Sequence, residues 1–247
     1  MASKKGVVRN AKKRRVETEI VDEIFPPKNE YEIKPLKWTE KQAKVIETSL
    51  KKDSQIIFIN APAGIGKTSI AIYCSLVLLK EKSVNKILFV RAPVEACDAK
   101  IGFLPSTLED KMQPYLQCGE DAMTAFIPKV EVIKMKENGV FSIMPIGFCR
   151  GLSFHNTAVI IEEGSDLRVA DLELAMSRYG KFSKMFIIGS PRQSSIKNSG
   201  FKKVFDAFNN EESQSKGIHC FEFANEDSMR SNLSKFILNK FENEIDP

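Results

Sequence analysis

The segment Ala61–Thr68, with the sequence APAGIGKT, constrains the fold of this chain more than any other feature. An apolar run, Gln55–Asn60, precedes it, and a helical pattern begins at Lys67. Strand, glycine-rich turn and helix start follow one another as a phosphate-binding loop requires, with Ala61 in the place of the usual first glycine. The alternative is an ordinary glycine-rich turn with an exposed lysine. The context favours the phosphate loop and predicts that the chain binds a nucleotide.

The positions of this segment have chemical reasons in a phosphate loop. Gly64 and Gly66 lack a Cβ, so backbone N–H groups around them can converge on phosphate oxygens. The positive end of the following helix dipole adds to that attraction. We expect Lys67 to reach the β- and γ-phosphates of ATP and the Thr68 hydroxyl to coordinate Mg²⁺. The predicted cofactor-binding residues of the loop are Ala63, Gly64, Ile65, Gly66, Lys67 and Thr68.

A second element of the same chemistry stands at the end of the apolar run Ala158–Glu162, where Glu162 is followed by Glu163. We expect Glu162, together with Thr68, to hold Mg²⁺, and Glu163 to orient or activate the attacking water. The first acid of such a pair is normally aspartate. The glutamate side chain is longer by a methylene, which shifts its carboxylate by about one C–C bond. The alternative is a pair of solvated acids that cap the next helix.

Short apolar runs alternate with helical patterns along the chain, and this alternation predicts the fold class. Runs such as Ile87–Arg91 are apolar on both faces, as in a parallel sheet covered on both sides. We predict an α/β fold of the P-loop NTPase type, a RecA-like parallel sheet with helices on both faces. The predicted strands are Gln55–Asn60, Ile87–Arg91, Val130–Met135, Ala158–Glu162, Lys184–Gly189 and His219–Phe223. The predicted helices are Thr39–Lys51, Lys67–Lys80, Ser106–Cys118, Val169–Tyr179 and Asp227–Phe241.

Charge is unevenly distributed over the 247 residues. The chain has a net charge of +5, yet residues 1–15 alone carry +7, which leaves −2 for the remainder. We predict a flexible basic arm over residues 1–30, which attracts the phosphate backbone of nucleic acids, and one folded domain over residues 31–247. A solubilising terminus and an import signal are the alternatives for the arm.

Composition disfavours several other classes of protein. No apolar run approaches the roughly 18 residues of a membrane span, and no apolar segment follows the basic N-terminus as in a secretory signal. The five cysteines form no CxxC pair, and the two histidines offer little for a metal site. We therefore expect a protein without membrane contact and with reduced thiols. The expected location is the cytoplasm of a bacterial cell or of a phage-infected host.

Several blocks of the chain resemble the PhoH-like family, P-loop ATPases common in bacteria and phages, over about residues 35–240. The blocks are Ala61–Thr68, Arg91–Ala96 with Ile101–Pro105, Pro145 with Arg150–Gly151, Ser177–Gly180, Gly189–Gln193 and Glu226–Arg230. The resemblance implies an ATPase core similar to superfamily 1 helicases, assembled as a homo-oligomer with a hexameric ring as the candidate form. It implies ATP, Mg²⁺ and single-stranded nucleic acid as ligands, with RNA favoured over DNA. Some members carry a PIN-type nuclease domain, for which this chain has no room, and we predict no nuclease activity.

Gln42 has two interpretations that do not exclude each other. The stretch Trp38–Gln42 is similar to a helicase Q motif, in which a glutamine amide pairs with adenine. The same residues fit the start of a helix, with Thr39 as N-cap and Gln42 closing a capping box.

The resemblance also assigns candidate roles beyond the loop. Gln193 is placed to sense the γ-phosphate or to position water. Arg178, Arg150 and Arg230 are candidate arginine fingers, in cis or across a ring interface, with Arg178 and Arg230 favoured because both lie in family-like blocks. The predicted catalytic residues are Lys67, Glu163, Arg178, Gln193 and Arg230.

The chain departs from the family pattern at its acids. The family's Asp-Glu-x-Gln is Glu162–Ser165 here, and its Gly-Asp is Gly189–Ser190. Because Lys67 and the phosphate cradle are intact, we expect ATP binding with slow or differently arranged hydrolysis. The leading hypothesis is an ATPase stimulated by nucleic acid. The alternative is a nucleotide-binding scaffold or switch in which ATP shifts assembly. A small-molecule kinase is disfavoured, because we find no arginine-rich lid segment.

Overall fold

The computed structural model describes residues 31–91, 119–190, 194, 196–228 and 231–240. The chain divides into two units, Met1–Glu32 and Ile33–Pro247, and the described strands and helices all belong to the second. The predicted arm, residues 1–30, and the predicted helix Ser106–Cys118 lie outside the described residues. Within the described part, no helix is both long and apolar enough to span a bilayer.

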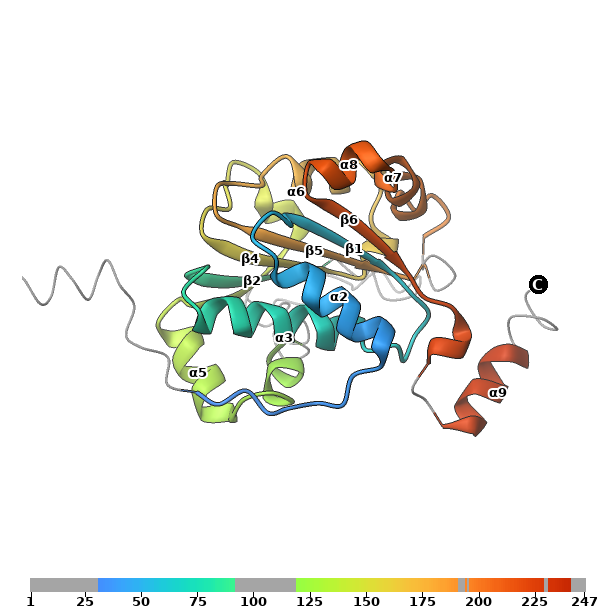
Figure 1. The fold of residues 1–247 in the computed structure, drawn as a ribbon. Coiled ribbons are helices and arrows are strands. Elements are labelled where there is room, and N and C mark those ends of the chain that lie inside the picture. The colour runs from blue at the N-terminus through green and yellow to red at the C-terminus, as the bar shows by residue number, and fades with distance from the viewer. Residues whose placement is uncertain (1–30, 92–118, 191–193, 195, 229–230, 241–247) are drawn as a thin grey trace, which may run out of the picture. The chain divides into compact units, whose positions relative to one another are not determined.

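A six-stranded parallel sheet forms the centre of the folded unit, which confirms the predicted fold class (Figure 1). The strand order is β3-β2-β4-β5-β1-β6. The strands are β1 Ile56–Asn60, β2 Lys86–Arg91, β3 Phe141–Pro145, β4 Thr157–Glu162, β5 Lys184–Gly189 and β6 Ile218–Glu222. Strands β1, β4 and β5 are buried along their whole length, which explains their continuous apolar sequences. Strand β5 separates β1 from β4.

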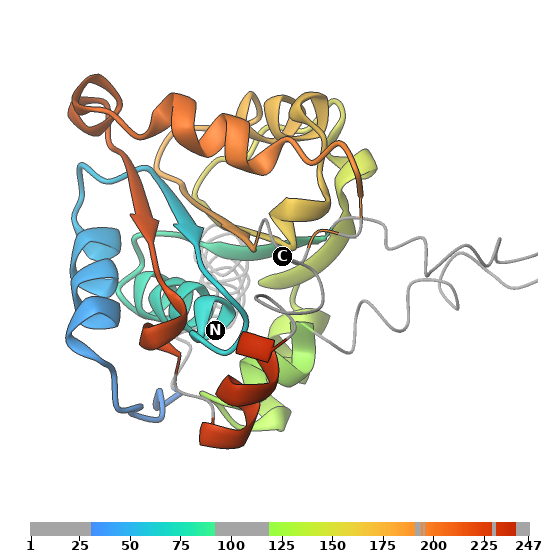
Figure 2. The same ribbon diagram turned by 90° about the vertical axis from the view of Figure 1, so that its right-hand side faces the viewer.

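Helices cover both faces of the sheet, with α2, α3 and α5 below it and α6, α7 and α8 above it in the view of Figure 1. Figure 2 shows the same layers from the right-hand side, with α9 in front. The helices are α2 Glu40–Leu50, α3 Lys67–Lys80, α5 Lys129–Glu137, α6 Val169–Met176, α7 Phe201–Phe208, α8 Glu211–Ser215 and α9 Asn232–Lys240. Short 3₁₀ turns are η1 Ile146–Cys149, η2 Gly164–Asp166 and η4 Asn225–Asp227. Phe58 of β1 packs against Phe201 and Phe205, at ring distances of 6.3 and 6.2 Å, and so joins α7 to the sheet.

The predicted strand over Val130–Met135 is wrong. These residues belong to helix α5, in which Val132 and Met135 are buried three positions apart while Val130 and Ile133 are exposed. That spacing fits a helix with one face on the protein, although the β-branched residues imitate a strand.

The strand at this end of the sheet is β3, which the sequence pattern does not reveal because only its first residue, Phe141, is buried. Two helices differ from their predicted bounds by three residues or more, and the other matched elements differ by one residue at most at either end. The helix predicted over Val169–Tyr179 ends at Met176, and the helix predicted over Asp227–Phe241 is interrupted between η4 and α9. Helices α7 and α8 are not among the predicted elements.

Candidate nucleotide-binding site

The segment between β1 and α3 has the backbone of a phosphate loop. Gly64 and Gly66 hold left-handed conformations, with φ of 84° and 79°, which glycine adopts without strain. Gly66 is the N-cap of α3, so the N–H groups of the first helical turn, which have no intrahelical partner, border the loop. Lys67 Nζ donates to the carbonyls of Ala61 and Pro62 at 2.7 and 2.9 Å, and therefore lies across the loop. This conformation is compatible with an anion held by backbone N–H groups.

Gln42 fastens the loop to α2. The carbonyl of Ile65, a fully buried residue, accepts a 2.7 Å hydrogen bond from Gln42 Nε2. The Oε1 atom of the same amide accepts from Thr39 N at 2.8 Å, and Thr39 Oγ1 accepts from Gln42 N, which confirms the capping box. Gln42 is only 1% exposed. Both ends of the amide thus contact the protein as a support for the loop, and the reading of adenine by Gln42 stays a prediction.

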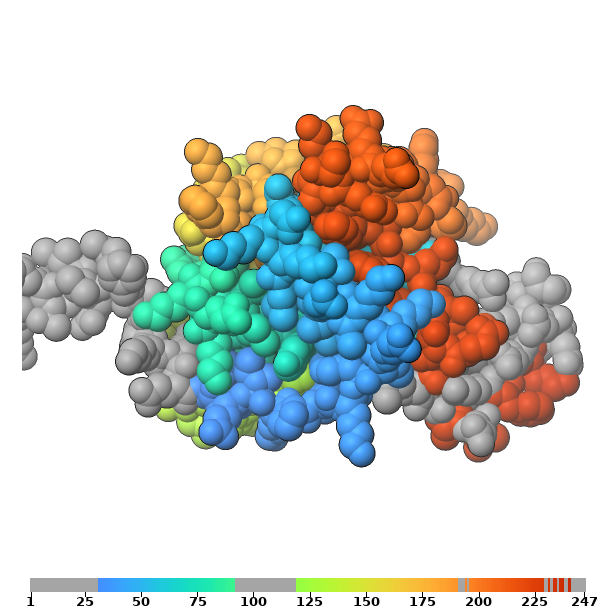
Figure 3. All heavy atoms as spheres, in the orientation of Figure 1, coloured from blue at the N-terminus to red at the C-terminus, as the bar shows by residue number. Residues whose placement is uncertain are grey.

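The first turn of α2 also contacts the residues that follow β6. Lys41 Nζ donates to Asp227 Oδ2 at 2.6 Å and lies 4.9 Å from the centre of the Phe223 ring. Figure 3 shows the blue atoms of α2 against the red-orange atoms of this segment. Nearby, Asn60 at the end of β1 donates from Nδ2 to Glu222 Oε1 at 2.8 Å. The phosphate loop is therefore held from α2 at its tip and from β6 at its start.

The carboxylate of Glu162 meets the hydroxyl of Thr68. Glu162 ends β4, and Thr68 Oγ1 donates to Glu162 Oε1 at 2.7 Å. The extra methylene of glutamate thus still delivers a carboxylate to the loop. Oε2 of Glu162 is buried and has no hydrogen-bond partner in the described part of the chain. A buried carboxylate oxygen beside a hydroxyl fits Mg²⁺, a hard cation that prefers oxygen ligands.

Burial dominates the electrostatics of Glu162. Removal from water raises the pKa of its carboxyl to about 7. The hydrogen bond from Thr68 lowers this pKa, the charge of Glu163 raises it, and the charges of Lys67 and Arg91 lower it. A buried acid among two cations and a second acid is typical of a functional site.

Arg91 is a site residue to which the sequence assigns no role. It ends β2, and the pairing of β2 with β4 sets Arg91 opposite Glu162. The resemblance places Arg91 at the start of a block but says nothing of its neighbours. A charged residue at the end of a buried strand is the signal that could have identified Arg91. To use that signal, one must know that β2 lies next to β4.

Glu163 has a φ of 52°, a left-handed backbone that few residues other than glycine adopt. It is the N-cap position of η2 and is partly exposed. Backbone strain of this kind gathers at functional sites, because the surrounding structure must enforce it. The position next to Glu162 is therefore consistent with the role predicted for Glu163.

Two of the three departures from the family pattern, Ser165 and Ser190, contact each other. Ser190 N donates to Ser165 Oγ at 2.6 Å, and both residues are buried. Ser190 follows β5, the strand between β1 and β4, so this contact lies between the phosphate loop and Glu162. Gln193 lies outside the described residues.

Of the candidate arginine fingers, Arg178 is held away from this site. The carbonyl of Arg178 accepts a 2.8 Å hydrogen bond from Phe154 N, ahead of β4. Arg178 therefore lies at the amino ends of the strands, across the sheet from the phosphate loop. Arg150 is exposed and follows η1, and Arg230 lies outside the described residues.

Comparison with known proteins agrees with this geometry. Residues 32–242 match the family described as PhoH-like protein. The chain belongs to the PhoH-like family. A PhoH-like protein of Synechocystis sp. is 31% identical over 160 residues, 65% of this chain and 48% of the relative. Its counterpart in Bacillus subtilis is 32% identical over 142 residues, 58% and 44% of the two chains. Protein PhoH of Escherichia coli is 28% identical over 195 residues, 77% and 54%.

This PhoH-like chain spans about half the length of these curated relatives. Among solved structures, the large terminase of a thermophilic bacteriophage is similar, with a TM-score of 0.50 over 83% of this chain and 50% of the terminase. The two sequences are 14% identical, so the likeness shows the fold alone. It agrees with a RecA-like α/β architecture.

Proposed function

We propose that this PhoH-like chain is a Mg²⁺-dependent ATPase that acts on or with single-stranded nucleic acid. The proposal is carried by one contact, the 2.7 Å hydrogen bond between Thr68 and Glu162 beside the phosphate loop. A phosphate loop by itself explains nucleotide binding. A buried carboxylate at the loop hydroxyl adds the oxygen ligands that a catalytic Mg²⁺ requires.

Each residue of the site has one task in this proposal. Backbone N–H groups of residues 63–66 hold the phosphates, and Lys67 exchanges the carbonyls of Ala61 and Pro62 for phosphate oxygens. Thr68 and Glu162 hold Mg²⁺, which when bound neutralises charge on the transferred phosphoryl group. Glu163 orients the attacking water.

The partners belong to the same proposal. We assign RNA in preference to DNA and a homo-oligomer, with a hexameric ring as its candidate form, from the family to which the chain belongs. Because Arg178 lies across the sheet from its own phosphate loop, its role as an arginine finger requires the nucleotide of a neighbouring subunit. Gln193 and Arg230 complete the proposed catalytic set.

A second function is favoured by the altered acids. Glu162 replaces the usual aspartate, and the neutral pair Ser165–Ser190 occupies positions where the family has polar residues including an aspartate. Nucleotide binding without turnover, as a switch or scaffold, is the function that these changes support.

One assay separates the two functions. ATP hydrolysis by the full chain is measured with Mg²⁺ or with a chelator, with and without single-stranded RNA and DNA, beside Lys67→Ala, Glu162→Asp and the control Lys44→Ala. Lys44 is an exposed residue of α2. We expect Mg²⁺-dependent turnover that rises with nucleic acid and falls at least about 100-fold in Lys67→Ala alone. A silent wild type that Glu162→Asp activates would establish the switch.

A further inference from the structure

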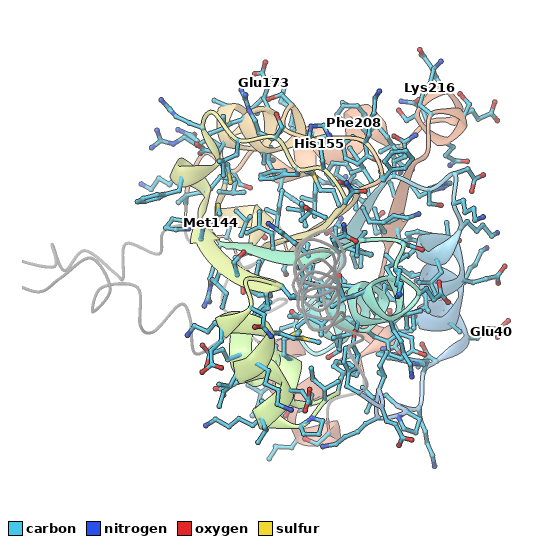
Figure 4. The ribbon with its side chains drawn as sticks, turned by 90° about the vertical axis from the view of Figure 1, so that its left-hand side faces the viewer. Glu40, Met144, His155, Glu173, Phe208 and Lys216 are labelled. Carbon is cyan, nitrogen blue, oxygen red and sulfur yellow. The ribbon has the colours of Figure 1, made fainter. Side chains whose placement is uncertain are left out.

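Six turns line the edge of the sheet opposite the phosphate loop, where the strands begin. We call these turns the amino-edge row: residues 51–55, 80–86, 136–140, 153–157, 181–184 and 214–217. Backbone hydrogen bonds join each turn to its neighbour in strand order. They run from Ile87 N to Val140 O, Asn85 N to Asn156 O, Asn156 N to Lys181 O, Met185 N to Gln55 O and Gln55 N to Gly217 O. The row is therefore one continuous, hydrogen-bonded surface. Figure 4 views the molecule from this side, with His155 and Lys216 labelled.

Exposed lysines are concentrated on the amino-edge row. Eight exposed lysines stand against three exposed acids. The lysines are Lys51, Lys52, Lys80, Lys82, Lys86, Lys136, Lys181 and Lys216, and the acids are Asp53, Glu81 and Glu137. Since the chain beyond residue 15 carries a net charge of −2, this surplus is local to one edge. Such a surface produces a positive potential that attracts polyanions.

Most of these lysines form no ion pair with the residues that the structure describes. Lys51 and Lys136 pair with Glu47 and Glu120, at 3.5 and 2.6 Å. In the described part of the chain, the other six have no acidic partner within 4.0 Å. Helix dipoles favour cations at helix carboxyl ends, which explains Lys80 at the end of α3. They do not explain Lys86 and Lys181, which lie outside the last turn of any helix.

Backbone strain is also concentrated on the row. Lys82, Asn156 and Phe182 have φ of 58°, 51° and 60°. The equivalent turns before β3 and β6 place Gly139 and Gly217 in this left-handed region, with φ of 65° and 81°. Asparagine tolerates such a conformation, whereas it is strained for lysine and phenylalanine.

The side chains of Lys82 and Phe182 are therefore retained at a cost to stability. Phe182 is 76% exposed, so packing in the core does not explain it. Among the described residues, the remaining non-glycine residue with positive φ is Glu163, in the candidate nucleotide site. In the described ranges, strain at non-glycine residues thus occurs at the row and at the candidate nucleotide site, and strain of this kind marks functional sites.

We propose that the amino-edge row binds the phosphate backbone of single-stranded nucleic acid, with Phe182 as the platform on which a base stacks. Five of the six turns carry lysines, adjacent turns are spaced by the strand interval of about 4.8 Å, and the ring of Phe182 lies among them; this composition matches surfaces that hold single strands. The inference rests on the proposed function for the kind of partner and adds the surface. That surface is distinct from the basic arm and lies across the sheet from the phosphate loop.

Charge reversal on the row tests the proposal. The triple variant K82E/K86E/K181E of the full chain is titrated into a labelled single-stranded oligouridylate at several salt concentrations, with fluorescence anisotropy as the readout. Single-strand contacts contribute about 0.7 each to the salt slope, so we expect the slope to fall by about 2 and the affinity by at least about tenfold. The matched control is K44E/K129E/K203E, exposed lysines of α2, α5 and α7 outside the row. We expect the salt slope of this control to differ from that of the wild type by less than the contribution of one contact, about 0.7.

Phe182→Asn separates recognition from folding. Asparagine accepts the left-handed backbone, so this variant unfolds at the same or a higher urea concentration than the wild type. Loss of one stacked base weakens oligonucleotide binding at least about fivefold. Unchanged binding would show that the ring has no part in recognition.

The outcomes distinguish failure of this inference from failure of the proposed function. If the wild type does not bind the oligonucleotide, nucleic acid is not the partner and both fail. If the wild type binds and K82E/K86E/K181E, with intact Mg²⁺-ATP affinity, binds equally well, the row is not the surface and the proposed function stands. If that variant binds equally but changes its mass in light scattering, the row holds a second copy, which also overturns the inference.

Discussion

The two edges of the sheet differ in how their residues are brought together. At the carboxyl edge, the phosphate loop is one contiguous segment, and Glu162 closes one apolar strand. At the amino edge, one to three exposed lysines from each of five turns, together with Phe182, form a surface only through the strand order. A motif can therefore be recognised in a sequence, whereas a surface built from a few residues of each turn is recognised only once the topology is known.

The largest effect on stability is expected at the carboxyl edge, where Gln42 supports the phosphate loop. Gln42→Ala leaves the buried Ile65 carbonyl without this donor and removes the acceptor of Thr39 N. We expect a loss of about 1–3 kcal/mol in the free energy of unfolding in urea, and a rise in KM for ATP that exceeds the change in kcat. Asn209→Ala, at an exposed amide after α7, is the control. Wild-type stability and KM in Gln42→Ala would show that the loop does not depend on α2.

An effect of intermediate size is expected from Lys184, the buried lysine of the row, through the pH dependence of stability. Lys184 Nζ donates to the carbonyls of Lys51 and Ser54, and burial lowers its pKa from 10.5 to about 8. The unfolded chain therefore keeps the Lys184 proton at pH values where the folded chain has released it. As a result, the contribution of Lys184 to stability rises from pH 8 to pH 10.5 and is lost as the pH falls through 8.

The measurement compares the free energy of unfolding of the wild type with that of Lys184→Met across this range. From pH 8 to pH 10.5 we expect the wild type to gain stability relative to Lys184→Met by on the order of 1–2 kcal/mol. This gain is smaller than the whole pKa shift would give, because solvent screens part of the charge. Lys86→Met, at an exposed position of the row, is the control variant. Parallel profiles for Lys184→Met and the wild type would contradict the burial of this charge.

The smallest effect concerns the strained backbone of the row. Lys82 N donates to Leu79 O and Ser83 N to Leu78 O, the bond pattern of a helix end that normally has glycine at the position of Lys82. Lys82→Gly should therefore raise the free energy of unfolding by about 1 kcal/mol while weakening oligonucleotide binding. Lys80→Gly, inside the last turn of α3, should lower stability instead. If Lys82→Gly proves less stable than the wild type, Lys82 stabilises the fold, and the strain argument for this residue is contradicted.

The sequence predicts the centre of the fold better than its edges. Strands β1, β2, β4 and β5 are recognisable because burial on both faces makes them continuous apolar runs. At the β3 edge, β3 has one buried residue and is therefore not recognised as a strand from its hydrophobicity. Helix α5 carries β-branched residues on its exposed face and is therefore mistaken for a strand. The sequence also misplaces the start of α9, because Asp227 belongs to the separate turn η4, where it pairs with Lys41 of α2.

The candidate site divides in the same way. Lys67, Thr68 and Glu162 are found from local sequence, and the structure brings them together. Arg91 beside Glu162 depends on β2 lying next to β4, and the contact of Ser165 with Ser190 depends on β5 lying beyond it. Residues that meet across neighbouring strands can be recognised only when the strand order is known. The spacing of residues within one segment does not give that order.

The most direct test of the account is isothermal titration of ATP, with and without Mg²⁺, into the wild type, Glu162→Gln and K82E/K86E/K181E. We predict that the wild type binds more tightly with Mg²⁺, that Glu162→Gln loses most of this dependence, and that the row variant binds as the wild type does. This result would place the metal-dependent nucleotide site at the carboxyl edge alone. A wild type indifferent to Mg²⁺, or a row variant that no longer binds ATP, would contradict the account.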